Sequence, residues 1–204
     1  MEKILIIGSG ALARDFVDIF GPHAFVGSYV DPGFSATPVG GLPVFLDWQE
    51  ALTQASHYII GVSDIEHRKR ARVNALNAGL SPASPMISDR AIVSAHASLS
   101  PGCVVTHFAV VGPFVRLCED VLVMHSAIVA HDSIVDVNSV LCTGVCLGGY
   151  VQIGAECFIG ANSVLAPSVK IGRGSFIAAG ASCFRDAEPG SLLVGNPARK
   201  AKKH

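Results

Sequence analysis

Residues 123–165 read VMHSAIVAHDSIVDVNSVLCTGVCLGGYVQIGAECFIGANSVL, and every sixth residue from Val123 onward is Val, Leu or Ile. The same period extends in both directions without a gap. Sixteen consecutive hexads carry an aliphatic residue at this position: Ile87, Val93, Leu99, Val105, Val111, Leu117, Val123, Val129, Val135, Leu141, Leu147, Ile153, Ile159, Leu165, Ile171 and Ile177. A strict six-residue period fits neither a helix of 3.6 residues per turn nor an alternating strand. It predicts a solenoid, a parallel β-helix in which each hexad contributes one short strand and one turn.

A second position of the hexad supports this interpretation. Four residues after each aliphatic the side chain is small or β-branched, as at Ala127, Ser133, Ser139 and Val145. Three hexads would close one triangular coil, and successive coils would stack about 4.8 Å apart. Each aliphatic would then point inward and pack on the aliphatic three hexads away. Because no hexad is interrupted, we expect no long loop between Ile87 and Ser182.

The N-terminal half begins with a short buried strand, Ile4–Ile7, followed directly by Gly8-Ser9-Gly10-Ala11-Leu12-Ala13 and a helix expected over residues 13–20. This is the order of strand, glycine-rich turn and helix that the dinucleotide fingerprint requires. Gly8 allows a tight turn, and Gly10 lets backbone N–H groups approach a phosphate at the helix N-terminus.

Two further loops of this half follow predicted strands. Asp31 follows a strand expected over residues 25–30, where an acidic side chain can meet a ribose or sugar hydroxyl, or can simply open a turn. Ser63 follows a strand expected over residues 58–62, and ligands of open α/β sheets bind at such carboxyl ends. Further elements are expected at 44–46, 48–54 and 65–78. A unit of about 80 residues is too small for a full dinucleotide domain, so a site for a mononucleotide or nucleotide sugar fits better than NAD.

The predicted fold class is therefore an α/β, Rossmann-like half domain followed by an all-β domain. We expect a nucleotide- or nucleotide-sugar-binding βαβ domain at 1–80 and a linker rich in Ser and Pro at 81–86. The β-helix would span 87–182, and a C-terminal tail would span 183–204.

The composition excludes several classes of function. A net charge of −1 gives no field for nucleic acid or for an anionic membrane. The apolar run Ile4–Ile7 is too short for a signal peptide, and no run reaches the ~18 residues of a membrane span, so a cytoplasmic protein is expected. None of the six cysteines forms a C-x-x-C pair, which favours small buried thiols over disulfides: Cys103, Cys118, Cys142, Cys146, Cys157 and Cys183.

The hexad array, the Gly-rich half before it and the segment Val194-Gly195-Asn196-Pro197-Ala198-Arg199-Lys200 after it resemble one family over nearly the whole chain. That family comprises the hexapeptide-repeat sugar acetyltransferases and is typified by the sialic acid O-acetyltransferases and the bacillosamine and perosamine N-acetyltransferases. The resemblance implies a left-handed β-helix and a homotrimer with active sites between subunits. It also implies acetyl-CoA as co-substrate, no metal, and an amino or hydroxyl group of a sugar, carried on a nucleotide, as acceptor in polysaccharide or glycan synthesis.

The resemblance also assigns the reacting groups. The family's base is the His of an H-[DE]-x-x-I-G hexad, and the matching segment here is His131-Asp132-Ser133-Ile134-Val135-Asp136. His131 would take the proton from the attacking amine or hydroxyl, with Asp132 orienting the imidazole, and attack on the thioester would be direct. Gly149 lies three hexads on, at the same corner of the next coil, and its backbone N–H is a candidate donor to the thioester oxygen.

The family lays the pantetheine of CoA along the β-helix between two subunits. Ala161 and Ala179 are the candidate backbone contacts, and Arg199 and Lys200 are candidates for the CoA phosphates. His125 occupies the same hexad position as His131 and is a candidate substrate contact. His107 lies one coil before His125, so these two imidazoles are expected to stack.

The chain departs from the family pattern at three places: Met124-His125 replaces the usual Asn-Thr, Val140 replaces a second His, and Leu12 replaces the His of the glycine-rich loop. These positions bear on the acceptor rather than on the base.

Several other interpretations stay open at this point. A histidine at this hexad position is commonly a solvated turn residue, and the basic C-terminal segment can be a solvated tail. O-acetylation of a free sugar and a non-catalytic nucleotide-sugar-binding scaffold are the alternative functions. Serine acetylation is disfavoured by the N-terminal half. A carbonic-anhydrase-like zinc site is disfavoured because the chain lacks that family's histidine pair at a spacing of five.

Overall fold

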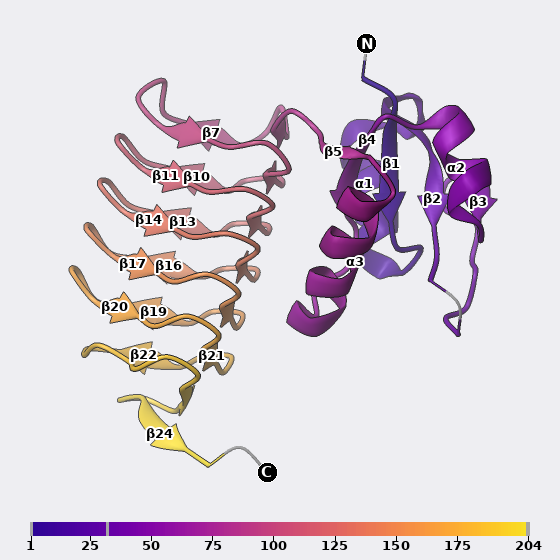
Figure 1. Ribbon diagram of the computed structural model, residues 1–204. Coiled ribbons are helices and arrows are strands. Elements are labelled where there is room, and N and C mark those ends of the chain that lie inside the picture. Colours follow the sequence, from indigo (N-terminus) through magenta and orange to yellow (C-terminus); the bar gives the residue numbers. More distant parts are fainter. Residues whose placement is uncertain (1, 32, 203–204) are drawn as a thin grey trace. The chain divides into compact units, whose positions relative to one another are not determined.

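The computed structural model describes residues 2–31 and 33–202. The chain divides into two compact units, Met1–Ser84 and Pro85–His204, each of which is drawn in Figure 1.

The first unit is a five-stranded parallel sheet with the order β3-β2-β1-β4-β5. Its strands are β1 (Ile4–Ile7), β2 (Phe25–Tyr29), β3 (Val44–Phe45), β4 (His57–Ile60) and β5 (Ser81–Pro82). Its helices are α1 (Ala11–Phe20), α2 (Trp48–Gln54) and α3 (Ile65–Asn77), with a single 3-10 turn, η1 (Pro22–Ala24). Each element predicted from the sequence is found close to its expected bounds. The expected linker differs, because Ser81 and Pro82 extend the sheet beside β4.

The central strand of this unit is buried along its whole length, which explains why it reads as a continuous aliphatic run. Leu5 and Ile7 belong to one core cluster with Tyr58 of β4 and with Ala71 and Ala75 of α3. Small residues on α3 therefore let that helix approach the sheet closely.

The second unit is a parallel β-helix. Seventeen two-residue strands follow one another at six-residue intervals: β6 (Met86–Ile87), β7 (Ile92–Val93), β8 (Ser98–Leu99), β9 (Val104–Val105), β10 (Val110–Val111), β11 (Arg116–Leu117), β12 (Leu122–Val123), β13 (Ile128–Val129), β14 (Ile134–Val135), β15 (Val140–Leu141), β16 (Cys146–Leu147), β17 (Gln152–Ile153), β18 (Phe158–Ile159), β19 (Val164–Leu165), β20 (Lys170–Ile171), β21 (Phe176–Ile177) and β22 (Ser182–Cys183). Each strand from β6 to β19 pairs in parallel with the third strand after it, as Val110 of β10 pairs with Ile128 of β13. Every third strand therefore joins one of three sheets (Figure 1). The predicted coil of three hexads and the absence of a long loop are both confirmed.

The inward aliphatic side chains form the core of the β-helix from Val105 to Ile177. The first coil is the exception, because Ile87 is 43% exposed and Val93 and Leu99 are only half-buried. Only one side of these residues has a further coil stacked on it. Serines at the small hexad position are also buried, and the hydroxyls of Ser133 and Ser139 donate to carbonyls of the next coil, as Ser139 does to the Gly154 carbonyl at 2.9 Å.

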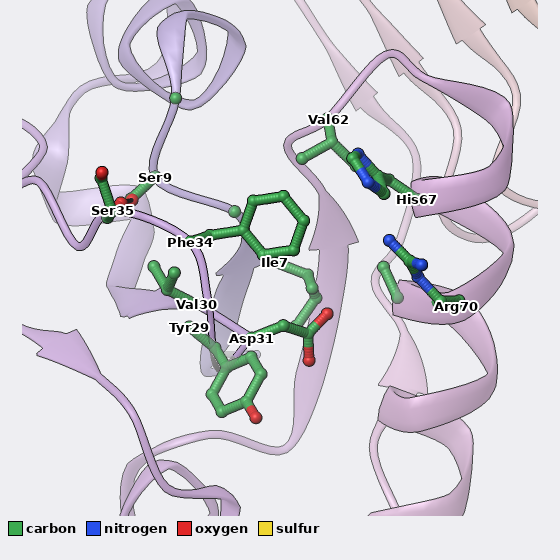
Figure 2. Close-up of a pocket in the computed structure, with 13 residues that line it drawn as sticks. Ile7, Ser9, Tyr29, Val30, Asp31, Phe34, Ser35, Val62, His67 and Arg70 are labelled. Carbon is green, nitrogen blue, oxygen red and sulfur yellow. Dashed lines mark hydrogen bonds between the residues drawn. The ribbon is translucent and has the colours of Figure 1, made fainter.

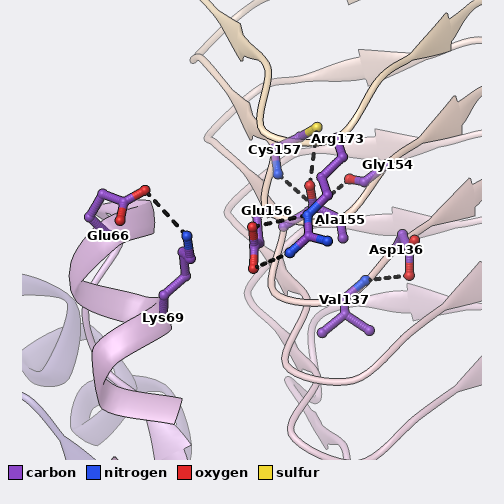
Figure 3. A network of polar contacts seen from close by, with 10 residues as sticks. Glu66, Lys69, Asp136, Val137, Gly154, Ala155, Glu156, Cys157 and Arg173 are labelled. Atoms are coloured by element: carbon purple, nitrogen blue, oxygen red, sulfur yellow. Dashed lines mark hydrogen bonds and ion pairs between the residues drawn. The ribbon is translucent and has the colours of Figure 1, made fainter. Parts of the chain in front are cut away.

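Each strand is followed by a two-residue turn at a corner of the triangle. From Gly102 to Gly180 the second residue of each turn adopts the left-handed conformation, as at Asp132 (φ 60°), Asn138 (φ 58°) and Asn162 (φ 56°). Asp and Asn tolerate this conformation better than other L-residues. At one corner the turns of successive coils are joined by an ion pair, in which the Arg173 guanidinium donates through Nε and Nη2 to both carboxylate oxygens of Glu156, at 3.2 and 3.0 Å (Figure 3).

The segment expected to be a C-terminal tail contains further strands. Cys183 of β22 is buried, so the repeat continues one strand beyond Ile177. Strand β23 (Leu192–Val194) then pairs in parallel with β21, and β24 (Arg199–Ala201) pairs antiparallel with β23. Residues 183–202 therefore do not form a free tail, because β23 and β24 extend the sheet that contains β21. In the described part of the chain, no helix has the length and apolar character needed to cross a membrane.

Candidate functional site

The candidate base sits in the turn between β13 and β14, at what we call the His131 corner, the column of first turn residues Pro113, His131, Gly149 and Pro167. Backbone hydrogen bonds hold this column in register. Asp132 N donates to Pro113 O at 3.0 Å, and Tyr150 N donates to His131 O at 3.0 Å. The turn is therefore fixed from the coil on either side, which gives the imidazole a rigid base.

His131 and Asp132 form a direct pair. The imidazole Nδ1 lies 2.9 Å from the Asp132 Oδ2, and the two side chains are 52% and 35% exposed. An ionised carboxylate can only accept, so in a neutral imidazole paired with it Nδ1 carries the proton and Nε2 carries the free lone pair. Asp132 has a left-handed backbone conformation, which Asp tolerates because its short side chain can form local hydrogen bonds. The arrangement orients the imidazole and leaves it open to solvent.

Gly149 packs directly against the imidazole, as the coil length predicts. A Cβ at Gly149 would lie 2.6 Å from His131 Cε1 and 2.7 Å from Nε2. Only glycine leaves room for the ring in this position. Among the described residues, the Gly149 N–H has no backbone acceptor, so it is free to donate to an oxygen brought beside Nε2.

Tyr150 completes the surroundings of the imidazole. Its ring is perpendicular to the His131 ring, with centroids 5.2 Å apart and an interplanar angle of 89°. Sequence reasoning missed this contact, although Tyr150 lies one coil after Asp132 and the spacing rule that relates His131 to Gly149 predicts that these two are also neighbours.

The other candidate histidine lies at a different corner. The His125 corner is the column His107, His125, Thr143, Ala161 and Ala179, in which Gly144 N donates to His125 O and Gly180 N donates to Ala161 O. The ring centroids of His107 and His125 are 6.1 Å apart, so the two residues are neighbours at one corner as expected, but their planes meet edge to face at 72° rather than stacking. The Ser88 hydroxyl bonds to His107 Nδ1. Strand β13 separates this corner from the His131 corner. One chain therefore does not bring His125, Ala161 and Ala179 to His131.

Arg199 and Lys200 lie on β24, where both side chains are exposed. They line a cavity next to the last coil together with Arg185 and Phe184. Sequence reasoning missed Arg185 because nothing in the hexad pattern links it to the C-terminal segment.

The N-terminal unit contains a pocket of about 200 Å³ at the carboxyl ends of β1 and β2 (Figure 2). Gly8, Gly10 and Asp31 line it together, whereas Ser63 does not and its neighbour Val62 does. A Cβ at Gly8 would lie 2.7 Å from a Val62 methyl group, and its φ of 116° suits only glycine. A Cβ at Gly10 would meet nothing within 4 Å, so the N-terminus of α1 faces open space.

Three further residues of this pocket were not predicted. Phe34, His67 and Arg70 line it, and the Phe34 and His67 rings are perpendicular with centroids 4.9 Å apart (Figure 2). Asn74 Nδ2 donates to Asp31 Oδ1 at 3.4 Å, which orients that carboxylate. The helical period of α3 places 67, 70, 71 and 74 on one face, so this signal was available in the sequence. The pocket thus combines a helix N-terminus, a cation, a carboxylate and an exposed aromatic ring.

Four of the six cysteines are buried thiols that are poorly suited to act as nucleophiles. Burial raises the pKa of the Cys103 thiol to about 12 and the pKa of the Cys142, Cys157 and Cys183 thiols to about 11. These groups stay protonated near neutrality, and all six cysteines are free. Among the described residues, no group of three or more His, Cys, Asp or Glu side chains could hold a metal ion.

Residues 150–185 match the family model described as bacterial transferase hexapeptide (six repeats). The match shows that this segment carries the hexapeptide repeat of bacterial transferases, in agreement with the resemblance inferred from the sequence. Curated relatives include a putative acetyltransferase, YvoF, of Bacillus subtilis, 45% identical over 51 residues, which are 25% of this chain and 30% of that protein. A chloramphenicol acetyltransferase of Klebsiella aerogenes is 38% identical over 55 residues, 27% of this chain and 26% of that protein. The matches thus span less than a third of these relatives.

Solved structures resemble this hexapeptide-repeat protein over its whole length. A mutant perosamine N-acetyltransferase from Caulobacter crescentus, in complex with CoA and GDP-perosamine, has a TM-score of 0.90 at 22% identity and covers 100% of this chain and 98% of its own. The acetyltransferase domain of PglB from Neisseria gonorrhoeae has a TM-score of 0.86 at 26% identity, over 98% of this chain and 100% of that one. This likeness confirms the predicted fold class, a Rossmann-like half domain followed by a left-handed parallel β-helix.

Proposed function

We propose that this protein is an acyl-CoA-dependent acetyltransferase that acetylates an amino or hydroxyl group of a sugar, carried on a nucleotide. The observation that carries the proposal is the His131–Asp132 pair, whose free Nε2 lies beside the backbone of Gly149. A base and an amide donor next to one open position are what acyl transfer to a nucleophile requires.

In the proposed reaction, the acceptor amine or hydroxyl attacks the thioester carbonyl carbon while His131 Nε2 takes its proton. Asp132 stabilises the imidazolium that forms. The Gly149 N–H donates to the carbonyl oxygen as negative charge develops on it. When the C–S bond breaks, the imidazolium returns the proton to the departing thiolate, so the products are the acetylated acceptor and CoA as the free thiol. No covalent enzyme intermediate is needed.

The N-terminal pocket supports a nucleotide-linked acceptor. The exposed N-terminus of α1 and the Arg70 guanidinium suit a diphosphate, Phe34 offers an aromatic face to a base, and the Asp31 carboxylate can accept from a sugar or ribose hydroxyl. The Caulobacter neighbour binds GDP-perosamine. Asp31→Ala should raise the KM for the nucleotide sugar more than the KM for acetyl-CoA. An equal effect on the two KM values, or no effect, would remove Asp31 from the acceptor site.

We further propose, from the family resemblance, a homotrimer with active sites between subunits, and the positions of the proposed CoA contacts support it. Ala161 and Ala179 lie at the His125 corner, so one pantetheine can reach them and Gly149 only where corners of two copies meet. The sheet between these corners exposes Ile92 (68%), Ile128 (42%) and Val164 (44%), an apolar surface suited to self-association. Arg199 and Lys200 would then bind the CoA phosphates, and the enzyme would work in the cytoplasm. Light scattering of the wild type and of Ile128→Glu tests the assembly, since the charged variant should be monomeric.

The activity itself is tested by thiol release from acetyl-CoA with a panel of acceptors. The panel contains UDP-, dTDP- and GDP-linked amino sugars, the corresponding neutral nucleotide sugars, and free sialic acid. Release that depends on one nucleotide-linked amino sugar, with mass spectrometry placing the acetyl group on its nitrogen, is the expected result. Release with free sialic acid alone would favour O-acetylation of a free sugar. Tight nucleotide-sugar binding without any release would favour the non-catalytic scaffold.

A further inference from the structure

Three aromatic residues of the β-helix occupy backbone positions that disfavour them. Phe108, Phe114 and Tyr150 are second residues of turns, with φ values of 61°, 60° and 61°. The left-handed conformation brings Cβ close to the following carbonyl, so it is costly for a bulky side chain and cheap for Gly or Asn. The same position elsewhere holds such residues, as at Gly144 and Asn162.

These aromatic side chains gain little burial in return. They are 59%, 61% and 56% exposed, respectively. A strained backbone combined with an exposed ring contributes nothing to the fold that an Asn or Gly would not supply better. Residues kept in costly conformations in this way cluster at binding and catalytic sites.

Two of the three flank the candidate base. Phe114 lies one coil before Asp132 and Tyr150 lies one coil after it, so the two rings lie on opposite sides of the His131–Asp132 pair along the β-helix. The backbone bonds from Asp132 N to Pro113 O and from Tyr150 N to His131 O fix this order. The Tyr150 ring touches the imidazole, and the Phe114 ring stacks on His96 at 5.4 Å. Phe108 instead contacts His107, away from the His131 corner.

We propose that Phe114 and Tyr150 form the acceptor subsite of the His131 corner and bind the apolar C–H face of the acceptor sugar ring. This inference rests on the proposed function and names the part of the acceptor that this surface recognises. A pyranose ring presents several C–H groups on one face, and an aromatic ring attracts them through its electron-rich face without any polar pairing. The polar edge of the sugar, with the nucleophilic amine or hydroxyl, is then turned toward His131 Nε2. A dideoxy sugar, which has fewer hydroxyls to desolvate, fits such a surface best.

Steady-state kinetics of matched variants test the subsite. Tyr150→Ala and Phe114→Ala should each raise the KM for the nucleotide-linked sugar roughly 5- to 50-fold, with the KM for acetyl-CoA within about twofold of wild type. Tyr150→Phe keeps the aromatic face and should stay near wild type. Phe108→Ala removes a ring of equal exposure and backbone conformation at another corner, so it should change neither constant. A rise in the acetyl-CoA KM alone would assign the rings to the thioester substrate and overturn the proposal.

Binding provides a measurement that does not depend on turnover. Calorimetry with CoA present would compare UDP-, dTDP- and GDP-linked 4-amino-4,6-dideoxyhexoses with the corresponding nucleoside diphosphates. In the wild type and in Phe108→Ala the sugar should strengthen binding. In Tyr150→Ala and Phe114→Ala this gain should disappear while the nucleoside diphosphate still binds. If the sugar adds nothing in the wild type, or if the gain survives both substitutions, the subsite is absent, whether or not thiol is released. A gain that depends on the rings in a protein that releases no thiol would instead refute the acetyl transfer.

Discussion

The His131 corner and the His125 corner have the same backbone and different chemistry. Both place a histidine in the first position of a turn, one immediately before β13 and one immediately after it. At the His131 corner the next residue is Asp132, whose carboxylate bonds to Nδ1, and the residue one coil on is Gly149. At the His125 corner the corresponding residues are Ser126 and Thr143, and the imidazole contacts a second imidazole, His107. A repeat can therefore carry an imidazole paired with a carboxylate or an imidazole paired with a second imidazole, and the next residue together with the residue one coil on distinguishes the two cases.

The sharpest test of this difference is to remove each imidazole. His131→Ala should lower kcat roughly 10²–10⁴-fold, because general base catalysis is lost. His107→Ala should leave kcat within about twofold of wild type. Thiol-release kinetics and thermal unfolding of both variants provide the measurement. Equal losses at the two corners would show that the carboxylate pair does not distinguish them.

The next largest loss of kcat is expected when the space that Gly149 leaves beside the His131 imidazole is filled. The backbone of Gly149 is not in the left-handed conformation, so it is compatible with alanine. The new methyl group, however, would collide with Cε1 and Nε2 of His131. Gly149→Ala should lower kcat by roughly 10²-fold, since displacement of a reacting group by about 1 Å has this cost. Thr143→Ala is the matched change at the other corner and should have no effect. A fully active Gly149→Ala protein would contradict the proposed location of the thioester.

Changing the carboxylate tests the orientation of the base alone. Asp132→Asn keeps a residue that tolerates φ near 60°, so the melting temperature should stay within a few degrees. Activity should fall roughly 10- to 100-fold, as for loss of a partner that orients a histidine. Ser126→Asp places a carboxylate beside His125 and should leave the rate unchanged. A rate gained there would mean that the His125 corner can also provide the base.

The smallest effect is expected at His125. If its ring contacts the acceptor from a neighbouring copy, His125→Ala should raise the acceptor KM about three- to tenfold, the cost of one hydrogen bond, with kcat unchanged. The KM for acetyl-CoA measured in the same series is the control. A change in kcat would instead move His125 into the chemistry.

The β-helix was predictable nearly residue by residue, because one period governs strand, turn and core together. The length of the coil also predicted that Gly149 lies against His131. The first coil was not predictable in the same way, since the period cannot indicate that Ile87, Val93 and Leu99 lack a coil on one side. Strand β5 was missed because two residues carry no periodicity.

The pocket and the CoA contacts show where sequence reasoning ends. Gly8, Gly10 and Asp31 follow from the glycine-rich turn and from a strand end, which are local features. Phe34 and Arg70 reach the same pocket from a loop and from α3, so only folding brings them together. Ala161 and Ala179 were expected to contact a pantetheine that lies between two subunits, and a whole number of coils relates them to His125 rather than to His131.

Because the six-residue repeat is uninterrupted, the effect of a deletion within the β-helix depends on whether it removes a whole coil. A deletion of three hexads would remove one coil and leave every later side chain on its original face. A deletion of a single hexad would turn each later side chain to the next face and place it above the wrong neighbours. Circular dichroism of two such deletions, both placed after Pro167, would show a shorter folded domain in the first case and a damaged C-terminal sheet in the second. Among natural variants of this protein, we therefore expect insertions and deletions within the repeat to come in whole coils.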